Sequence, residues 1–168
     1  MKISMHAMSV GLVLPILNNF LGILDKAVAS AEARKFDSKV LADARLAPDM
    51  YPLTRQVQIA CDFAKNGAAR LAGQDPPKHE DNEQTMAELK ARVQKAIAYL
   101  KTVPASAIDG SEDRDIRIPM RDRALEMKGL QYLQVFMLPN FYFHVVAAYL
   151  ILRHNGVDVG KFDYTGRP

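Results

Sequence analysis

Apolar residues recur at helical spacing in four long segments, and this periodicity limits the possible folds more than any other feature of the chain. The stripes lie in residues 13–31, 53–71, 86–100 and 130–155. Each amphipathic helix must bury its apolar face against a neighbour, and no strong strand pattern competes with the four stripes. The sequence therefore predicts an all-α four-helix bundle that forms a single domain over residues 1–168.

Caps and breakers give the expected boundaries of these helices. The helices are expected at residues 4–35, 52–71, 82–103 and 130–155. Pro15 removes one backbone hydrogen bond from the first helix and is expected to bend it. Gly156 is expected to end the last helix in the left-handed conformation. Residues 108–129 alternate with a period of two, which predicts a short hairpin-like excursion before the last helix.

Charge and cysteine content exclude several classes of protein. The net charge is +3 with a pI near 9.0, but no block of Lys and Arg concentrates the positive charge. A nucleic-acid-binding protein needs such a basic patch, so we expect no nucleic-acid partner. Cys61 is the single cysteine, which excludes an internal disulfide and a cysteine-based zinc cluster. Its small and apolar neighbours indicate a buried hydrophobic side chain.

The apolar run at the N-terminus follows a helical stripe and is interrupted by polar residues, so it is interpreted as a core helix instead of a signal peptide. No stretch reaches about 18 consecutive apolar residues, and we expect no membrane-spanning helix. These features predict a cytoplasmic protein.

Among the four histidines, His144 is the one predicted to lie in the middle of a helix among large apolar residues, so it is the strongest candidate for a functional histidine. Asn140 is four residues earlier and therefore lies on the same helix face. A metal site needs three or four converging ligands, and the neutral amide of Asn140 is a weak one. No acidic residue lies between Gly129 and Asp158. The pair therefore resembles an incomplete metal site. Among the other histidines, His79 is expected in a solvated loop.

The stretch "HVVAAYLILRHNG", with His144, Arg153 and Gly156 at fixed spacing, resembles the last helix of DinB-like (DinB/YfiT-type) proteins. The resemblance implies a four-helix bundle with up-down-down-up connections. Many members hold zinc or nickel on three histidines, one in the second helix and an HxxxH pair in the last. Several are metal-dependent, thiol-linked transferases or isomerases. By this resemblance His144 takes the second place of the pair and Asn140 the first.

Three further stretches are similar to an uncharacterised bacterial branch of that superfamily, a domain of unknown function. They are "ARLAPDMYPLTRQVQIACDFAK", "PNFYFHVVAAYLILRHNGV" and "GKFDYTG". In the second-helix segment only Gln56 and Gln58 could stand where the family has its histidine. The resemblance therefore implies a branch that lacks the three-histidine metal site.

Three functions are left open. The first is a metal-free bundle without a cofactor, which binds a small molecule or a partner in the former metal cleft. His144 is then the best candidate for a catalytic residue. The cleft would be lined by His144, Asn140, Gln56, Tyr51, Asp49 and Tyr149.

The second function is a divalent-metal-dependent, thiol-linked transferase or isomerase with unusual ligands. It requires zinc or nickel on His144 together with His6 or Asp49. The third is a structural or interaction protein that acts as a homodimer. It is suggested by aromatic side chains that go round the last helix, at Phe136, Phe141, Tyr142 and Phe143.

Overall fold

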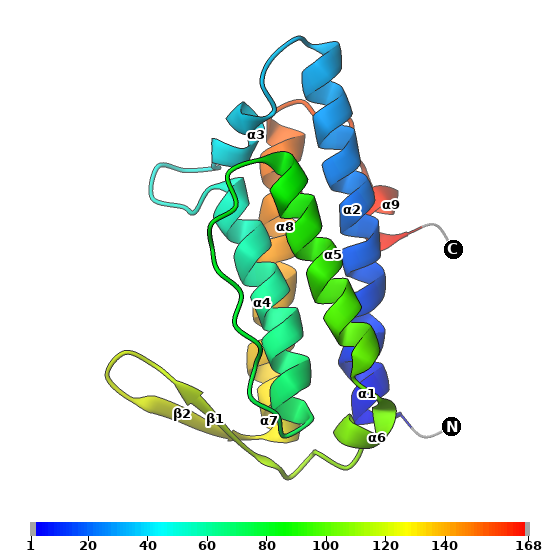
Figure 1. Cartoon of the computed structure of the whole chain (residues 1–168), viewed down its shortest axis with the longest axis vertical. Coiled ribbons are helices and arrows are strands. Elements are labelled where there is room, and N and C mark those ends of the chain that lie inside the picture. The colour runs from blue at the N-terminus through cyan, green and yellow to red at the C-terminus, as the bar shows by residue number, and fades with distance from the viewer. Residues whose placement is uncertain (1–2, 167–168) are drawn as a thin grey trace.

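Figure 1 shows four long helices side by side in the computed structural model, which describes residues 3–166. They are α2 (Val10–Ala33), α4 (Leu53–Leu71), α5 (Met86–Thr102) and α8 (Leu138–His154). Helices α2 and α8 run in one direction, and α4 and α5 run in the other. Their apolar faces share one core, as the four stripes predict.

Shorter elements precede, connect and follow these helices within the part of the chain that the structure describes. They are the helices α1 (Met5–Met8), α3 (Lys39–Asp43), α6 (Ala105–Ile108), α7 (Gly129–Tyr132) and α9 (Lys161–Thr165), and the π-helical turn Leu133–Met137. The strands β1 (Asp115–Pro119) and β2 (Ala124–Lys128) pair antiparallel. The chain is therefore mostly helical with one small sheet, and the hairpin-like excursion before the last helix is confirmed. The four predicted helices omit the shorter ones.

The predicted first helix is wrong in one respect, because it is interrupted at Ser9. The Ser9 hydroxyl donates a hydrogen bond to the Met5 carbonyl at 2.7 Å, and the Ser9 backbone leaves the helical region. Pro15 lies inside the uninterrupted helix α2. Pro15 and Gly11 are both exposed, so water can bond the Gly11 carbonyl that the proline leaves without a donor.

Helix α8 ends as the sequence predicts. Gly156 has a φ of 79°, and its backbone N–H donates to the Arg153 carbonyl at 3.1 Å. Only glycine adopts this conformation readily, which explains why the helix stops there. Gly129 begins α7, which leads into α8. A Cβ at this position would lie 2.0 Å from the Ser111 carbonyl oxygen. The approach of these two chain segments therefore requires glycine.

Helix α4 is buried on most of its surface, between α8, α5 and α3. Small residues such as Ala60 and Ala64 allow its neighbours to approach closely. Three polar side chains are buried on the same helix, and each is at most 4% exposed. They are Gln56, Gln58 and Lys65. Buried polar groups need hydrogen-bond partners, so the elements around α4 must supply them.

The connector between α4 and α5, residues 72–85, lies along both helices and supplies partners for two of these side chains (Figure 1). The Gln58 amide donates to Glu83 at 2.9 Å. The Lys65 ammonium donates to the Pro77 carbonyl and lies 3.3 Å from Asp62. These bonds fix a long segment that has no regular secondary structure of its own.

Arg92 of α5 lies at the centre of this packing. Its side chain is 1% exposed, and its guanidinium nitrogens lie 2.9 Å from Asp62, 3.0 Å from Asp81 and 3.0 Å from Glu83. It also donates to the Glu80 carbonyl at 2.8 Å. A buried guanidinium is tolerated only with such close partners, so Arg92 couples the connector to α4 and α5.

This network corrects the predicted start of the third helix at residue 82. Asp81 and Glu83 must leave the helical path to reach Arg92, and α5 begins only at Met86. Thr85 caps it, and Thr85 and Glu88 form a reciprocal capping box.

Two helical stretches, Met5–Ala33 and Gly129–His154, are long and apolar enough to cross a membrane by length and composition alone. Core helices of soluble proteins pass the same test, so this is weak evidence. Phe20 and Phe141 of these stretches are fully buried in the core. The absence of a membrane-spanning helix stays a prediction.

Replacing Arg92 with Met tests the role of the buried network in stability. Methionine keeps the apolar stem but leaves three carboxylates without their shared cation, so we expect the free energy of unfolding to fall by about 3–5 kcal/mol. Urea unfolding measures this loss. Lys39→Ala, which removes an exposed ion pair with Asp43, is the control and should change the value by no more than about 0.5 kcal/mol. Equal effects of the two substitutions would contradict the assigned role.

Candidate functional site

Gln56 of α4 and His144 of α8 form a buried hydrogen bond, with 2.7 Å between Gln56 Oε1 and His144 Nδ1. Gln56 is 1% exposed and His144 is 9% exposed. The Gln56 amide also donates, through Nε2, to the Tyr51 carbonyl at 3.2 Å. A carbonyl oxygen only accepts hydrogen bonds, so the amide must present its oxygen to His144. The donor in the buried bond is therefore His144 Nδ1–H.

This assignment leaves the lone pair of neutral His144 on Nε2. Among residues 3–166 no hydrogen bond of Nε2 is found, and the His144 residue as a whole is 9% exposed. Burial lowers the pKa of His144, and the positive charge of Arg55 lowers it further. At neutral pH the side chain is therefore an uncharged imidazole whose acceptor atom, Nε2, is bound by no residue among 3–166.

Aromatic rings frame this imidazole. The ring of Phe63 from α4 stacks on it with a centroid distance of 5.9 Å and an angle of 13°. Phe143 meets it edge to face at 5.2 Å and is itself 60% exposed. Tyr51 is 57% exposed, and the Arg55 guanidinium lies 6.0 Å from the centroid of its ring. The seam between α4 and α8 thus combines one polar acceptor with apolar rings.

The other predicted site residues do not join this pair. Asn140 donates to the Phe136 carbonyl at 2.7 Å, one turn earlier in its own segment. Tyr149 donates to the Val159 carbonyl at 3.4 Å. Asp49 is exposed in the loop before α4. His6 lies in α1, where its backbone N–H donates to Asp109 at 2.8 Å. Among the residues described, no hydrogen bond links any of these four to His144.

The donor groups do not fit zinc or nickel. No cluster of three or more His, Cys, Asp or Glu side chains that could hold a metal occurs within residues 3–166. Gln56 and Asn140 offer only neutral amides, and both are engaged in hydrogen bonds. Such amides are weak ligands for these metals, so His144 alone remains as a good one.

Cys61 does not add reactive chemistry to this helix. Its side chain is 0% exposed, and burial raises the pKa of its thiol to about 12. A thiol with this pKa carries almost no thiolate at neutral pH. The prediction of a small buried hydrophobic residue agrees with this placement.

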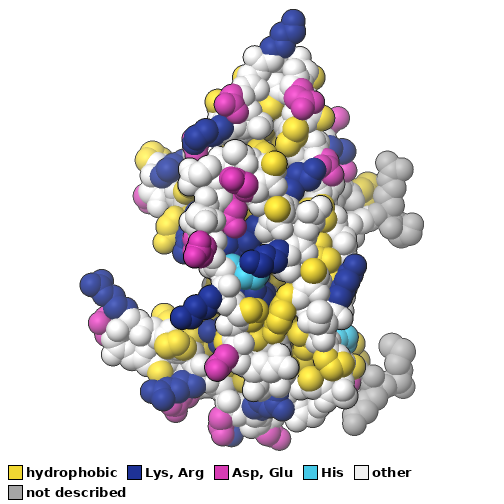
Figure 2. Space-filling model, in the orientation of Figure 1, with side chains coloured by type: hydrophobic (Ala, Val, Ile, Leu, Met, Phe, Trp, Pro, Cys, Tyr) yellow, Lys and Arg dark blue, Asp and Glu magenta, His cyan; other side chains and the backbone are white. Residues whose placement is uncertain are grey.

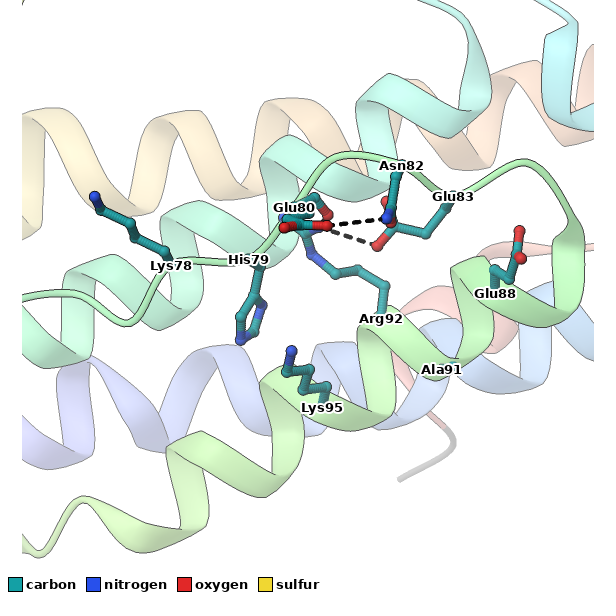
Figure 3. Close-up of a pocket in the computed structure, with 9 residues that line it drawn as sticks. All are labelled: Lys78, His79, Glu80, Asn82, Glu83, Glu88, Ala91, Arg92 and Lys95. Carbon is teal, nitrogen blue, oxygen red and sulfur yellow. Dashed lines mark hydrogen bonds and ion pairs between the residues drawn. The ribbon is translucent and has the colours of Figure 1, made fainter.

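A concave site lies between the connector and α5, away from His144, with a volume of about 560 Å³ (Figure 3). It is lined by Lys78, His79, Glu80, Asn82, Glu83, Glu88, Ala91, Arg92 and Lys95. In Figure 3 the ring of His79 points toward the side chain of Lys95. Both signs of charge line this pocket, and Arg92 is already paired with carboxylates. The pocket therefore does not select a ligand of one charge.

His79 lies in a loop, as predicted, but its side chain is half-buried and not fully solvated. Its Nδ1 is buried and has no hydrogen-bond partner among the residues described. Burial, together with the charges of Lys65, Lys95 and Arg92, lowers the pKa of His79 to about 4. The local sequence "PPKHED" gives no sign of this burial. The one available signal is Arg92, a charged residue beside the apolar stripe of α5, together with the acidic residues of the connector.

Comparison with known proteins places this fold in a family. Residues 5–165 match the family described as domain of unknown function DUF1993. The chain is similar to the crystal structure of a DinB family member protein from Shewanella denitrificans, with 42% sequence identity and a TM-score of 0.89. The similarity covers 97% of this chain and 92% of that one. No curated protein matches the chain. The chain therefore belongs to the DUF1993 family and is a DinB-like domain of unknown function.

Proposed function

We propose that this DinB-like protein works without a bound metal and binds a small molecule at the seam between α4 and α8, with His144 Nε2 as the acceptor. The observation that supports it most is the hydrogen bond between Gln56 and His144, which occupies Nδ1 and leaves Nε2 available. In this proposal α2, α4, α5 and α8 form a DinB/YfiT-type up-down-down-up bundle, and the protein acts in the cytoplasm.

The electrostatics favour binding over proton transfer. A ligand O–H or N–H can donate to Nε2 while Gln56 holds the ring in place. Complete transfer of the proton would create an imidazolium that burial and the nearby Arg55 both disfavour. His144 is therefore a better hydrogen-bond acceptor than a general base at neutral pH.

The surroundings of His144 suggest the class of ligand. Phe63 and Phe143 offer apolar ring surface beside the acceptor atom. The Arg55 guanidinium already donates to Gln58 and is paired with Asp81, so it offers little to an acidic ligand. The site suits a neutral, partly aromatic molecule that carries a hydroxyl or N–H donor.

The metal-dependent alternative requires further metal ligands that, within residues 3–166, do not lie beside His144. His6 and Asp49 are the candidates, and each would have to leave its present position to reach His144. No specific observation favours such a movement, so the transferase or isomerase function is the weaker proposal.

Metal analysis after dialysis separates the two proposals. We expect wild-type protein to retain no stoichiometric zinc or nickel, because His144 has no second strong ligand. The double variant Gln56→His/Asn140→His supplies two more imidazoles and should hold about one metal ion per chain. Elemental analysis measures both. Stoichiometric metal in the wild type that is lost in His144→Asn would refute the metal-free proposal.

A screen of small phenols and indoles tests the ligand proposal, with dissociation constants measured by isothermal titration calorimetry for the wild type and each variant. We expect His144→Asn to weaken the binding of any such compound about tenfold, which is the value of one lost hydrogen bond. Asn140→Ala is the matched control on the same helix and should leave affinity unchanged, because Asn140 bonds to Phe136. Binding that survives in His144→Asn would place the site elsewhere.

A further inference from the structure

Helix α8 and the π-helical turn before it share an outer face that is exposed to solvent and apolar. The sequence has no charged residue between Lys128 and Arg153. The inner face of α8 is already buried in the core, for example at Phe141 and Val145. Most surface helices carry polar side chains on the outer face, and an exposed apolar patch is typical of an interaction site. This helix therefore has two apolar faces, of which the fold covers only one.

The exposed side chains form one continuous stripe, here called the α8 stripe. It consists of Val135, Pro139, Phe143, Val146 and Leu150. Spacings of four, four, three and four residues keep them on one side of the helix. Phe143 is 60% exposed and Val135 is 58% exposed. At 1.5 Å per residue the stripe is about 22 Å long.

Apolar surface continues beyond the Val135 end of the stripe. Leu130, Met8 and Ile3 are exposed there, around a hollow of about 360 Å³. The face formed by α2, α4, α5 and the connector is different, because Lys, Arg, Asp and Glu are scattered over it (Figure 2). The apolar character is therefore a property of the α8 side and not of the whole surface.

We propose that a second copy of this chain covers the α8 stripe, with its own α8 antiparallel and the two-fold axis beside Phe143. Phe143 is near the middle of the stripe, so an antiparallel copy brings Val135 against Leu150 and Pro139 against Val146. A two-fold interface of this kind needs one self-complementary patch, which the stripe provides. The inference rests on the stripe and not on the ligand, although Phe143 also borders the site proposed at His144.

The charges at the two ends of the stripe match this arrangement. Arg153 and His154 are exposed just beyond Leu150, and the Arg153 guanidinium lies 3.8 Å from the exposed carboxylate of Asp158. Glu112 is exposed at the other end, where its backbone carbonyl accepts from Leu130 N–H at 2.9 Å. Glu112 also lines the hollow of about 360 Å³ at this end. An antiparallel copy places the basic end beside the partner's acidic end, whereas a parallel copy places like charges together.

A lipid surface fits this face less well. Helices that lie on a membrane usually carry Lys and Arg along the borders of the apolar face. The segment between Lys128 and Arg153 has none. The packing of the inner face of α8 into the core also leaves only one side of the helix for a partner.

Sedimentation velocity on the full chain tests the proposed dimer. We expect the wild type to be a dimer and Phe143→Glu to raise the dissociation constant at least about 100-fold, because it buries charge at the axis. Phe162→Glu is the matched control, since Phe162 is 61% exposed on α9 and lies outside the stripe. It should remain dimeric. Thermal unfolding of each variant checks that the fold is intact.

A charge swap tests the direction of the pairing. Arg153→Glu and Glu112→Arg should each weaken the dimer about fivefold, and the double variant should restore it. A monomeric wild type overturns the proposal, whether or not it sediments with anionic phospholipid vesicles. A dimer that Phe143→Glu leaves intact places the interface elsewhere. If Phe143→Glu is monomeric but the double variant does not regain the affinity of the wild-type dimer, the antiparallel arrangement is overturned.

Discussion

The buried polar side chains of α4 impose the constraint on which the rest of the structure depends. The helix is enclosed by its neighbours, so Gln56, Gln58 and Lys65 need partners that water cannot supply. The connector provides them on one side, where Glu83 and the Pro77 carbonyl accept hydrogen bonds. Helix α8 provides the remaining partner on the other side. The need to satisfy one central helix thus fixes both a long irregular segment and the position of a histidine.

That position determines the chemistry available at the seam. Gln56 donates to Tyr51 and accepts from His144, so both ends of its amide are occupied. The amide holds the imidazole in one tautomer, as the outer hydrogen bond does for many metal-binding histidines. No cluster of metal-ligating side chains is found within residues 3–166, and in our proposal this preorganised nitrogen accepts a hydrogen bond from a small molecule.

The sequence predicts local features of this protein better than long-range ones. Periodicity locates the four long helices, and the resemblance to DinB-like proteins brings Gln56 and His144 together before any coordinates are known. The partner of Asn140 is not predictable, because its bond to Phe136 spans a π-helical turn that no apolar period indicates. The burial of His79 follows from the connector folding back onto Arg92, which depends on contacts between segments distant in sequence.

The protonation state of His144 is the central claim, and nitrogen-15 NMR of the histidine side chains measures it directly. The structure requires a neutral ring with the proton on Nδ1 at neutral pH and a pKa below the usual 6.5 for histidine. Below that pH the unfolded chain takes up the proton before the folded one, so acid should weaken the fold through this residue. We expect these nitrogen signals to stay unchanged when zinc is added. A proton on Nε2, or a zinc-induced shift at His144, would contradict it.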